Sequence, residues 1–152
     1  MEIENLFILD TKITQNMVVF KFTYTEKPIT ELRMLKTIEM LKNVLNSFHR
    51  NEIKNICFVF VVNSIQMPSN MKLFKDFAET FHSYSDVINK KLNFTIIQSN
   101  NKIFKVFFSL FKVYYEPIKP LYMSESDEVT KKCLESKTER SKTEIFSKII
   151  NE

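Results

Sequence analysis

Glycine is absent from this chain of 152 residues, although average usage of about 7% would supply about ten. The absence excludes several phosphate-binding and catalytic loops, because each needs a residue without a Cβ in a strained turn or close to a phosphate. A Walker A loop, a dinucleotide-binding G-x-G-x-x-G turn and a G-x-S-x-G nucleophile elbow are therefore ruled out. Turns that require a positive φ must use another residue, and we expect asparagine, which occurs 13 times, to form them.

Cysteine and histidine are present only twice each. Cys57 lies inside an apolar run, where we expect a small buried hydrophobe, and Cys133 lies in a polar helical segment. His49 and His82 each lie near the end of a predicted helix, with no Cys, Asp or His at metal-ligand spacing. We therefore expect no disulfide framework, no metal site, no cofactor and a reducing compartment.

Long apolar stretches are also missing. No run approaches the ~18 residues of a membrane span, and the first 20 residues carry four charged side chains, unlike a signal peptide. The net charge is +4, but the 19 lysines are scattered and never form a run longer than two. We expect a cytoplasmic protein that does not bind nucleic acid and contacts a membrane only peripherally.

Apolar and aromatic residues, in contrast, are plentiful. The hydrophobic fraction is 44% and the charged fraction 26%, both ordinary for one globular domain of this length. Fifteen Phe and five Tyr predict a core built largely from aromatic rings. The 19 lysines against three arginines, with many Asn, Ile and Phe, are typical of an AT-rich genome, such as that of a virus, protist or bacterium.

Four segments have the pattern of strands. An apolar run at residues 6–9 and an alternating segment at 17–24 predict a leading hairpin, with the polar residues 10–16 between them. Residues 53–62 contain seven consecutive apolar side chains, which indicates a strand covered on both faces. Short strands are also predicted at 93–98 and 121–123.

Helices are predicted at residues 30–50, 69–88, 101–115 and 124–136. Thr30 is the expected N-cap of the first helix. Its predicted apolar face consists of Leu32, Leu35, Ile38, Leu41, Leu45 and Phe48. The order β-β-α-β-α-β-α-β-α predicts an α/β fold with a single mixed, mostly parallel sheet of four or five strands and about four helices. Residues 1–136 would form this domain, and residues 137–152 a charged C-terminal extension.

This element order resembles that of a STAS domain, the fold of bacterial anti-sigma-factor antagonists and of the cytoplasmic tails of sulfate transporters. The resemblance covers about residues 4–136 and rests on the strand pair, the buried strand and the short strand before the last helix. In regulatory members, a serine of an Asp-Ser-Ser-Gly-like motif is phosphorylated where the second helix starts. Here Met67-Pro68-Ser69-Asn70 lies there, so the resemblance implies phosphorylation of Ser69, although the Asp and Gly are missing. Helix capping alone also explains a serine at that position.

The helix predicted at residues 101–115 has a surplus of apolar surface. Its polar side chains recur at spacings of three and four and form one narrow stripe, whereas a surface helix needs an apolar arc of only about 100°. Two explanations fit the surplus. Either neighbouring helices and the C-terminal extension cover it, or part of it is an exposed patch that contacts another chain. The predicted interaction patch consists of Phe104, Phe107, Phe108, Phe111, Tyr114 and Tyr115.

No group of residues predicts catalysis. The acids near apolar strand ends are Asp10, Glu26 and Asp76, which are as easily solvent-exposed. His82, Ser83 and Asp86 lie close in sequence, but at these helical positions they cannot form a nucleophile, a base and an orienting group around one pocket.

We therefore interpret the chain as a non-enzymatic interaction or regulatory module whose partner is a protein, either a second copy or another chain. The third predicted helix is its expected contact. One alternative is a lipid- or apolar-ligand-binding domain of the CRAL-TRIO kind, which is usually longer. Another is an enzyme whose site residues are dispersed along the sequence.

Overall fold

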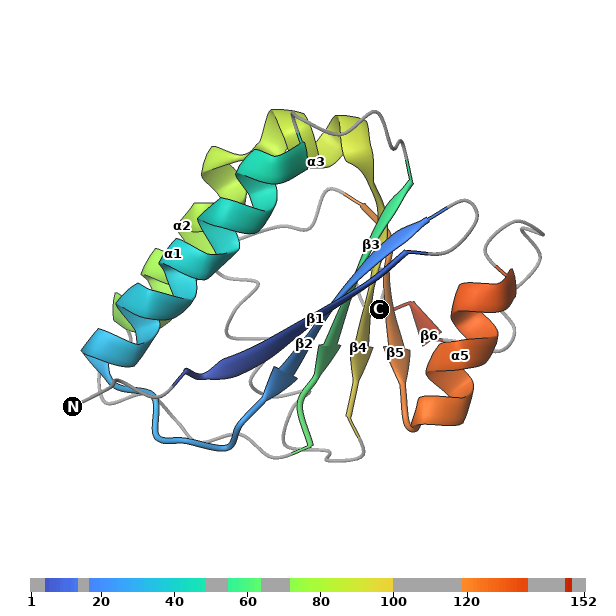
Figure 1. Cartoon of the computed structure of the whole chain (residues 1–152), viewed down its shortest axis with the longest axis horizontal. Helices are drawn as coiled ribbons and strands as arrows, with labels where there is room; N and C mark the ends of the chain where they lie inside the picture. Colours follow the sequence, from blue (N-terminus) through green and yellow to red (C-terminus); the bar gives the residue numbers. More distant parts are fainter. Residues whose placement is uncertain are drawn as a thin grey trace.

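The computed structural model describes residues 5–13, 17–48, 55–63, 72–99, 119–136 and 147–148. Within these residues the chain forms one mixed sheet with helices on both faces (Figure 1). The body of the sheet consists of β1 (Phe7–Ile13), β2 (Val18–Tyr24), β3 (Ile56–Val61), β4 (Leu92–Gln98) and β5 (Leu121–Ser124). A two-residue strand, β6 (Ser147–Lys148), pairs with β5.

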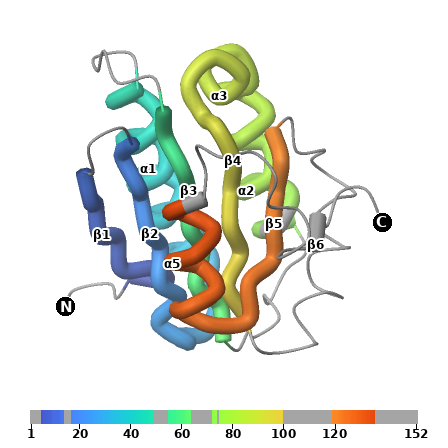
Figure 2. The backbone as a smooth tube through the Cα atoms, turned by 90° about the vertical axis from the view of Figure 1, so that its right-hand side faces the viewer, coloured from blue at the N-terminus to red at the C-terminus, as the bar shows by residue number. Residues whose placement is uncertain are grey.

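The strands lie side by side in sequence order, from β1 to β6. The pairs β1–β2 and β5–β6 are antiparallel, and the three pairs between them are parallel. Each parallel pair needs a crossover: α1 (Glu31–Ser47) connects β2 to β3, and α2 (Lys72–Ser83) and α3 (Ser85–Lys91) lie between β3 and β4. These helices cover one face of the sheet, and α5 (Asp127–Ser136) lies on the other (Figures 1 and 2). The predicted α/β fold class is confirmed.

The strand predicted to be the sheet interior lies where expected. In β3, Ile56, Cys57, Phe58 and Val59 are each at most 1% exposed. Ile56 and Phe58 belong to the cluster under α1, α2 and α3, whereas Cys57 and Val59 belong to the cluster under α5. Because successive strand residues point to opposite faces, only a continuous apolar run supplies apolar side chains to both clusters.

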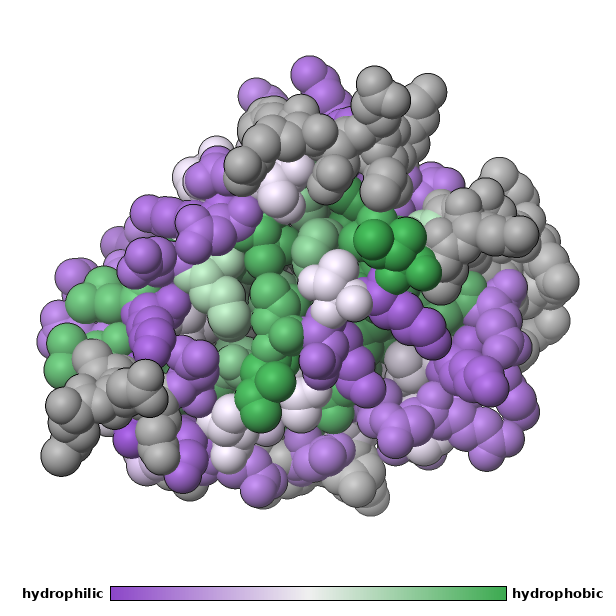
Figure 3. All heavy atoms as spheres, viewed as in Figure 1, coloured by the Kyte–Doolittle hydropathy of each residue, from purple (hydrophilic) through white to green (hydrophobic). Residues whose placement is uncertain are grey.

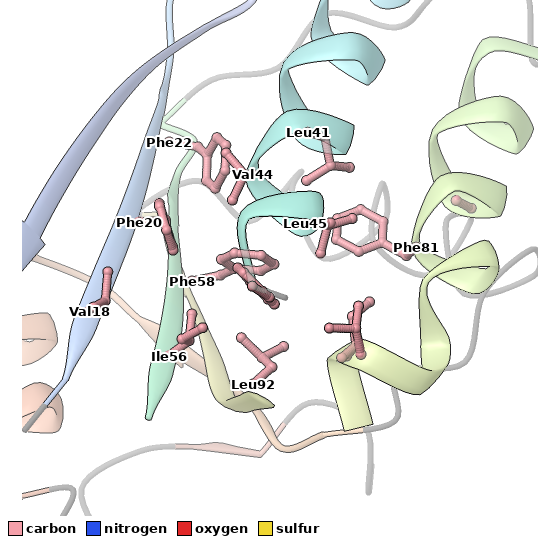
Figure 4. Close-up of a cluster of buried hydrophobic side chains, with 14 residues drawn as sticks. Val18, Phe20, Phe22, Leu41, Val44, Leu45, Ile56, Phe58, Phe81 and Leu92 are labelled. Carbon is pink, nitrogen blue, oxygen red and sulfur yellow. The ribbon is translucent and has the colours of Figure 1, made fainter. Parts of the chain in front are cut away.

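Aromatic rings fill the larger core, as the composition predicts. Phe20 and Phe22 of β2 and Phe58 of β3 point toward α1 and α2 (Figure 4). The ring of Phe48, at the end of α1, stacks on Phe20 with centroids 5.9 Å apart, and Phe22 lies edge-on to Phe58 at 5.6 Å. These contacts fix the position of α1 against the sheet, because a shifted helix would separate the rings and leave voids.

The N-terminus of α1 is as predicted, but the predicted apolar face is wrong at two positions. The Thr30 side chain accepts a hydrogen bond from the Arg33 backbone N–H, at 3.3 Å. The helix ends at Ser47, however, and Leu32 and Leu35 are 61% and 54% exposed. Residues spaced three apart fall about 60° short of a full turn at each step, so Leu32 lies opposite Leu41, which is buried.

The buried stripe of α1 follows the true helical period instead. Its members recur every three or four residues, with Val44 and Leu45 side by side in one turn: Met34, Thr37, Leu41, Val44, Leu45 and, beyond the last turn, Phe48. Met34 and Thr37 were not part of the predicted face. Leu32 and Leu35 lie on the side of α1 that faces solvent.

Two other boundaries differ from the sequence pattern. Strand β1 continues through Asp10, Thr11 and Lys12 to Ile13, because its antiparallel register with β2 runs on to Val18. The helix predicted at residues 69–88 is divided at Tyr84 into α2 and α3. The third helix predicted at residues 101–115 lies outside the described residues.

Among the described residues, the position with a positive φ is Glu26, at 68°, and not the expected asparagine. Contacts on both sides hold this turn: the Thr25 hydroxyl donates to the carbonyls of Asn5 and Leu6, and the Tyr24 hydroxyl donates to the Lys27 carbonyl at 2.6 Å. Such contacts can maintain a backbone conformation that the residue itself disfavours.

Candidate functional site

The site residues predicted from the sequence lie mostly outside the described residues. Ser69 and His49 are there, and so is the whole predicted interaction patch: Phe104, Phe107, Phe108, Phe111, Tyr114 and Tyr115. Three described regions carry polar or exposed apolar groups that a functional site would use. They are the carboxyl ends of β4 and β5, the buried thiol of α5, and the solvent-facing side chains of β1 and α1.

A buried polar cluster lies at the carboxyl ends of β4 and β5, where ligands often bind to parallel sheets. Gln98 ends β4, Ser124 ends β5, and α5 contributes Asp127 and Thr130. The Gln98 amide donates to Asp127 Oδ1 at 2.7 Å. Thr130 Oγ1 lies 2.8 Å from Gln98 Oε1 and 2.7 Å from Ser124 Oγ. The cluster thus joins two strands to one helix.

Ser124 also orients the first turn of α5. Its hydroxyl lies 2.8 Å from the Ser126 carbonyl, and the Ser126 hydroxyl accepts from the backbone N–H of Val129 at 3.3 Å. The hydroxyls of Ser124 and Thr130 make three contacts: with the Ser126 carbonyl, with Gln98 Oε1 and with each other. Because two hydroxyls supply only two protons, one of the three contacts lacks a proton at any moment.

The hydrogen bonds of this cluster are complete and hidden from solvent. Gln98, Ser124 and Thr130 are each at most 6% exposed, and every buried side-chain N or O atom of the described residues has a hydrogen-bond partner. The exposed His82 belongs to α2, on the other face of the sheet from α5, so it cannot serve the Ser124 hydroxyl as a base. Sequence reasoning looked for acids at strand ends, and so it missed the uncharged Gln98 and Ser124.

The predicted acid candidates do not come together as a site. Asp10 is exposed on β1, Glu26 is exposed in the turn after β2, and Asp76 is on α2, 3.9 Å from the ammonium group of Lys72. The Ser83 hydroxyl donates to the Thr80 carbonyl of its own helix, at 2.8 Å. In the part of the chain that the structure describes, no cluster of three or more His, Cys, Asp or Glu side chains is arranged to hold a metal ion.

Both cysteines are buried, and neither forms a disulfide. Cys57 was predicted to be buried, whereas Cys133 was placed in a polar segment, and its 5% exposure shows that it faces the sheet. Burial raises the pKa of the Cys133 thiol from 9.0 to about 12. Burial, and then the neighbouring Cys133, raise the pKa of Tyr122. A thiol that stays protonated at neutral pH is a poor nucleophile.

Exposed apolar side chains form the remaining candidate site. In the part of the chain that the structure describes, four large ones are more than half exposed: Ile8 and Ile13 on β1, at 56% and 72%, and Leu32 and Leu35 on α1, at 61% and 54%. In the space-filling view, hydrophobic atoms gather where β1 crosses the middle of the molecule, with a smaller group over α1 (Figure 3). Single exposed leucines need no explanation. Ile8 and Ile13 point to opposite faces of the sheet, because side chains alternate along a strand, and so they flank the same strand edge on both sides. This edge is the candidate contact surface.

Strand β1 is the outermost described strand on its side of the sheet (Figure 2). The backbone N–H of Thr25 donates to the Leu6 carbonyl at 2.8 Å. Hydrogen-bonded positions alternate along an antiparallel pair, so Ile8, Asp10 and Lys12 direct their backbone groups toward β2. Phe7, Leu9, Thr11 and Ile13 direct theirs away from the sheet.

Comparisons with known proteins find no family model, no curated protein and no solved structure that matches this chain. The resemblance to STAS domains therefore rests on the chain's own element order. Among the described residues, no helix is both long and apolar enough to cross a membrane.

Proposed function

We propose that the chain is a non-enzymatic interaction module that associates with a second copy of itself. The observation that carries the proposal is the exposure of Ile8 and Ile13 on the edge strand β1, with Leu32 and Leu35 of α1 as a separate exposed pair. Burying such side chains between two copies stabilises a complex by about 25 cal/mol per Å² of apolar surface, before the cost of association is subtracted.

The polar groups of the described residues support a binding role over a catalytic one. The buried hydroxyls of Ser124 and Thr130 hold α5 on the sheet, and the Cys133 thiol packs in an apolar cluster. Because these buried side chains stabilise the fold, we assign recognition of a partner to the surface of the protein.

The sequence adds a second surface to the proposal. The apolar surplus at residues 101–115, with Phe107 and Phe111 in its middle, is the predicted contact for another chain. A phosphate on Ser69, at a predicted helix N-terminus, would be stabilised by the helix dipole and would give such a module a switch.

Sedimentation velocity tests the proposal most directly. Across about 1 μM to 1 mM, a range that spans moderate to weak association, we expect the sedimentation coefficient to rise with protein concentration. A single monomeric species at every concentration would overturn self-association. Light scattering on the same samples gives the number of copies in the complex.

A further inference from the structure

We infer that two copies pair through their β1 strands, antiparallel and centred on Thr11, so that their sheets join into one. This inference rests on the proposed self-association and names the surface that carries it. β1 is the outermost described strand on its side of the sheet, and its outer backbone groups belong to Phe7, Leu9, Thr11 and Ile13. An edge of this kind is a template for another strand.

The charges of β1 select the register of the pair. Asp10 and Lys12 flank Thr11 and point to the same face of the sheet. In an antiparallel pair centred on Thr11, Asp10 lies opposite Lys12 of the second copy, and Lys12 lies opposite its Asp10. Opposite charges at such positions attract, whereas like charges repel. A pair centred on Asp10 would instead set the two Asp10 carboxylates against each other.

The backbone pattern agrees with that register. The central pair, Thr11 with Thr11, and the two flanking pairs, Leu9 with Ile13, all involve residues whose N–H and C=O groups point outward. Each such pair exchanges two hydrogen bonds in an antiparallel ladder. A register shifted by one residue in only one strand would pair outward groups with inward ones.

The apolar side chains gain partners in the same arrangement. Leu9 pairs with Phe22 inside the chain, and Ile13 pairs with Val18. Across the interface, Ile13 would lie beside Leu9 of the second copy and continue that apolar row. This accounts for the 72% exposure of Ile13 in the single chain. The register therefore satisfies charge, backbone and apolar groups together.

Charge reversal tests the register. Lys12→Asp sets acids against acids across the interface, and we expect a roughly tenfold or greater rise in the dimer dissociation constant. Asp10→Lys sets lysines against lysines and weakens the dimer likewise. Lys12 and Asp10 are exposed, so the fold should survive both changes. Mixing the two variants restores opposite pairs, and the heterodimer should form about as tightly as the wild-type dimer.

A proline at the centre tests the backbone. Thr11→Pro removes an outward N–H that β2 does not use, so the monomer should stay folded while the dimer is lost. Circular dichroism checks the fold of the monomer. An unfolded variant would itself count against the inference, because an edge-strand position whose N–H points away from the sheet should accept proline.

Phe107→Asp separates this inference from the predicted contact at residues 101–115. Pairing through β1 leaves this variant dimeric, as it does Ser109→Asp, the matched control on the polar stripe of that predicted helix. If neither Lys12→Asp nor Thr11→Pro weakens the dimer but Phe107→Asp abolishes it, the β1 inference is overturned and the proposed function still stands. A monomeric wild type overturns both.

Discussion

Thr130 is 6% exposed, and its hydroxyl connects α5 to both neighbouring strands, through Gln98 Oε1 and Ser124 Oγ. Hydrogen bonds of this kind offset the cost of burying polar groups, because each group exchanges a bond to water for a bond within the protein. When one partner is removed, the other stays buried without a hydrogen bond and the full cost of its desolvation remains. At the scale of residues, the attachment of α5 therefore depends on polar atoms as well as on its apolar side.

We expect Thr130→Val to lower the free energy of unfolding by roughly 1–3 kcal/mol, because it keeps the volume but removes the proton that Gln98 and Ser124 share. Urea denaturation followed by circular dichroism measures the loss. Thr80→Val is the matched control, since the Thr80 hydroxyl is equally buried but donates only to the Asp76 carbonyl of its own helix. Equal losses in the two variants would show that the contact between α5 and the sheet contributes nothing extra.

The Cys133 thiol predicts a loss of stability at high pH. In the unfolded chain the thiol ionises near pH 9.0, whereas in the folded chain it stays neutral up to about pH 12. Ionisation therefore favours the unfolded state in that window, and the contribution of Cys133 is complete below pH 9 and falls as the pH rises.

Urea denaturation between pH 9 and pH 12 measures this slope. The slope should be shallower in Cys133→Ala than in the wild type. It should not vanish, because burial also raises the pKa of Tyr122. Identical slopes in the two proteins would mean that the thiol ionises as freely in the fold as in the unfolded chain.

At the scale of elements, the sequence predicts existence and type better than orientation. The apolar run of β3, the alternating side chains of β2 and the Thr30 cap each carry a local signal, and each element forms where it was predicted. The face of α1 has no such local signal, because leucines at spacings of three and four fit more than one stripe. Tertiary packing chooses the stripe that begins with Met34 and Thr37 and leaves Leu32 exposed.

This choice predicts two classes of substitution in α1. Leu32→Asn and Leu35→Asn should change the free energy of unfolding by less than about 0.5 kcal/mol, since both side chains face solvent. Leu41→Ala and Leu45→Ala should each cost roughly 2–5 kcal/mol, because they open cavities beside the sheet. Chemical denaturation of the four variants checks the order. A large loss of stability in Leu32→Asn would contradict this assignment, because it would show that the Leu32 side chain is buried.

At the scale of the molecule, the parallel direction of the central strands follows from the sequence pattern but the polar cluster does not. Alternating strands and helices imply parallel neighbours, as found. Gln98 and Thr130, in contrast, are 32 residues apart and meet only because β4 and α5 pack together. Single residues such as these carry no periodic signal. A polar side chain that ends an apolar strand, as Gln98 and Ser124 do, is the closest sequence clue.

The C-terminal residues give the last prediction. Residues 137–152 were predicted to be an extension outside the domain, yet β6 pairs Ser147 with Met123 and Lys148 with Tyr122. Because this pairing involves only two residues of β6, a chain ending at Ser136 should fold with a loss of about 1–2 kcal/mol, the net value of one or two hydrogen bonds.

Urea denaturation of the truncated chain measures that loss, and Ser147→Pro in the full chain provides the matched comparison. The proline disfavours the ladder at β6 while keeping every other residue of the extension. Equal losses in the two proteins would assign the whole effect to strand pairing. A truncated chain that fails to fold would mean that the body of the sheet needs residues 137–152, because five strands and the helices packed on them would then be insufficient.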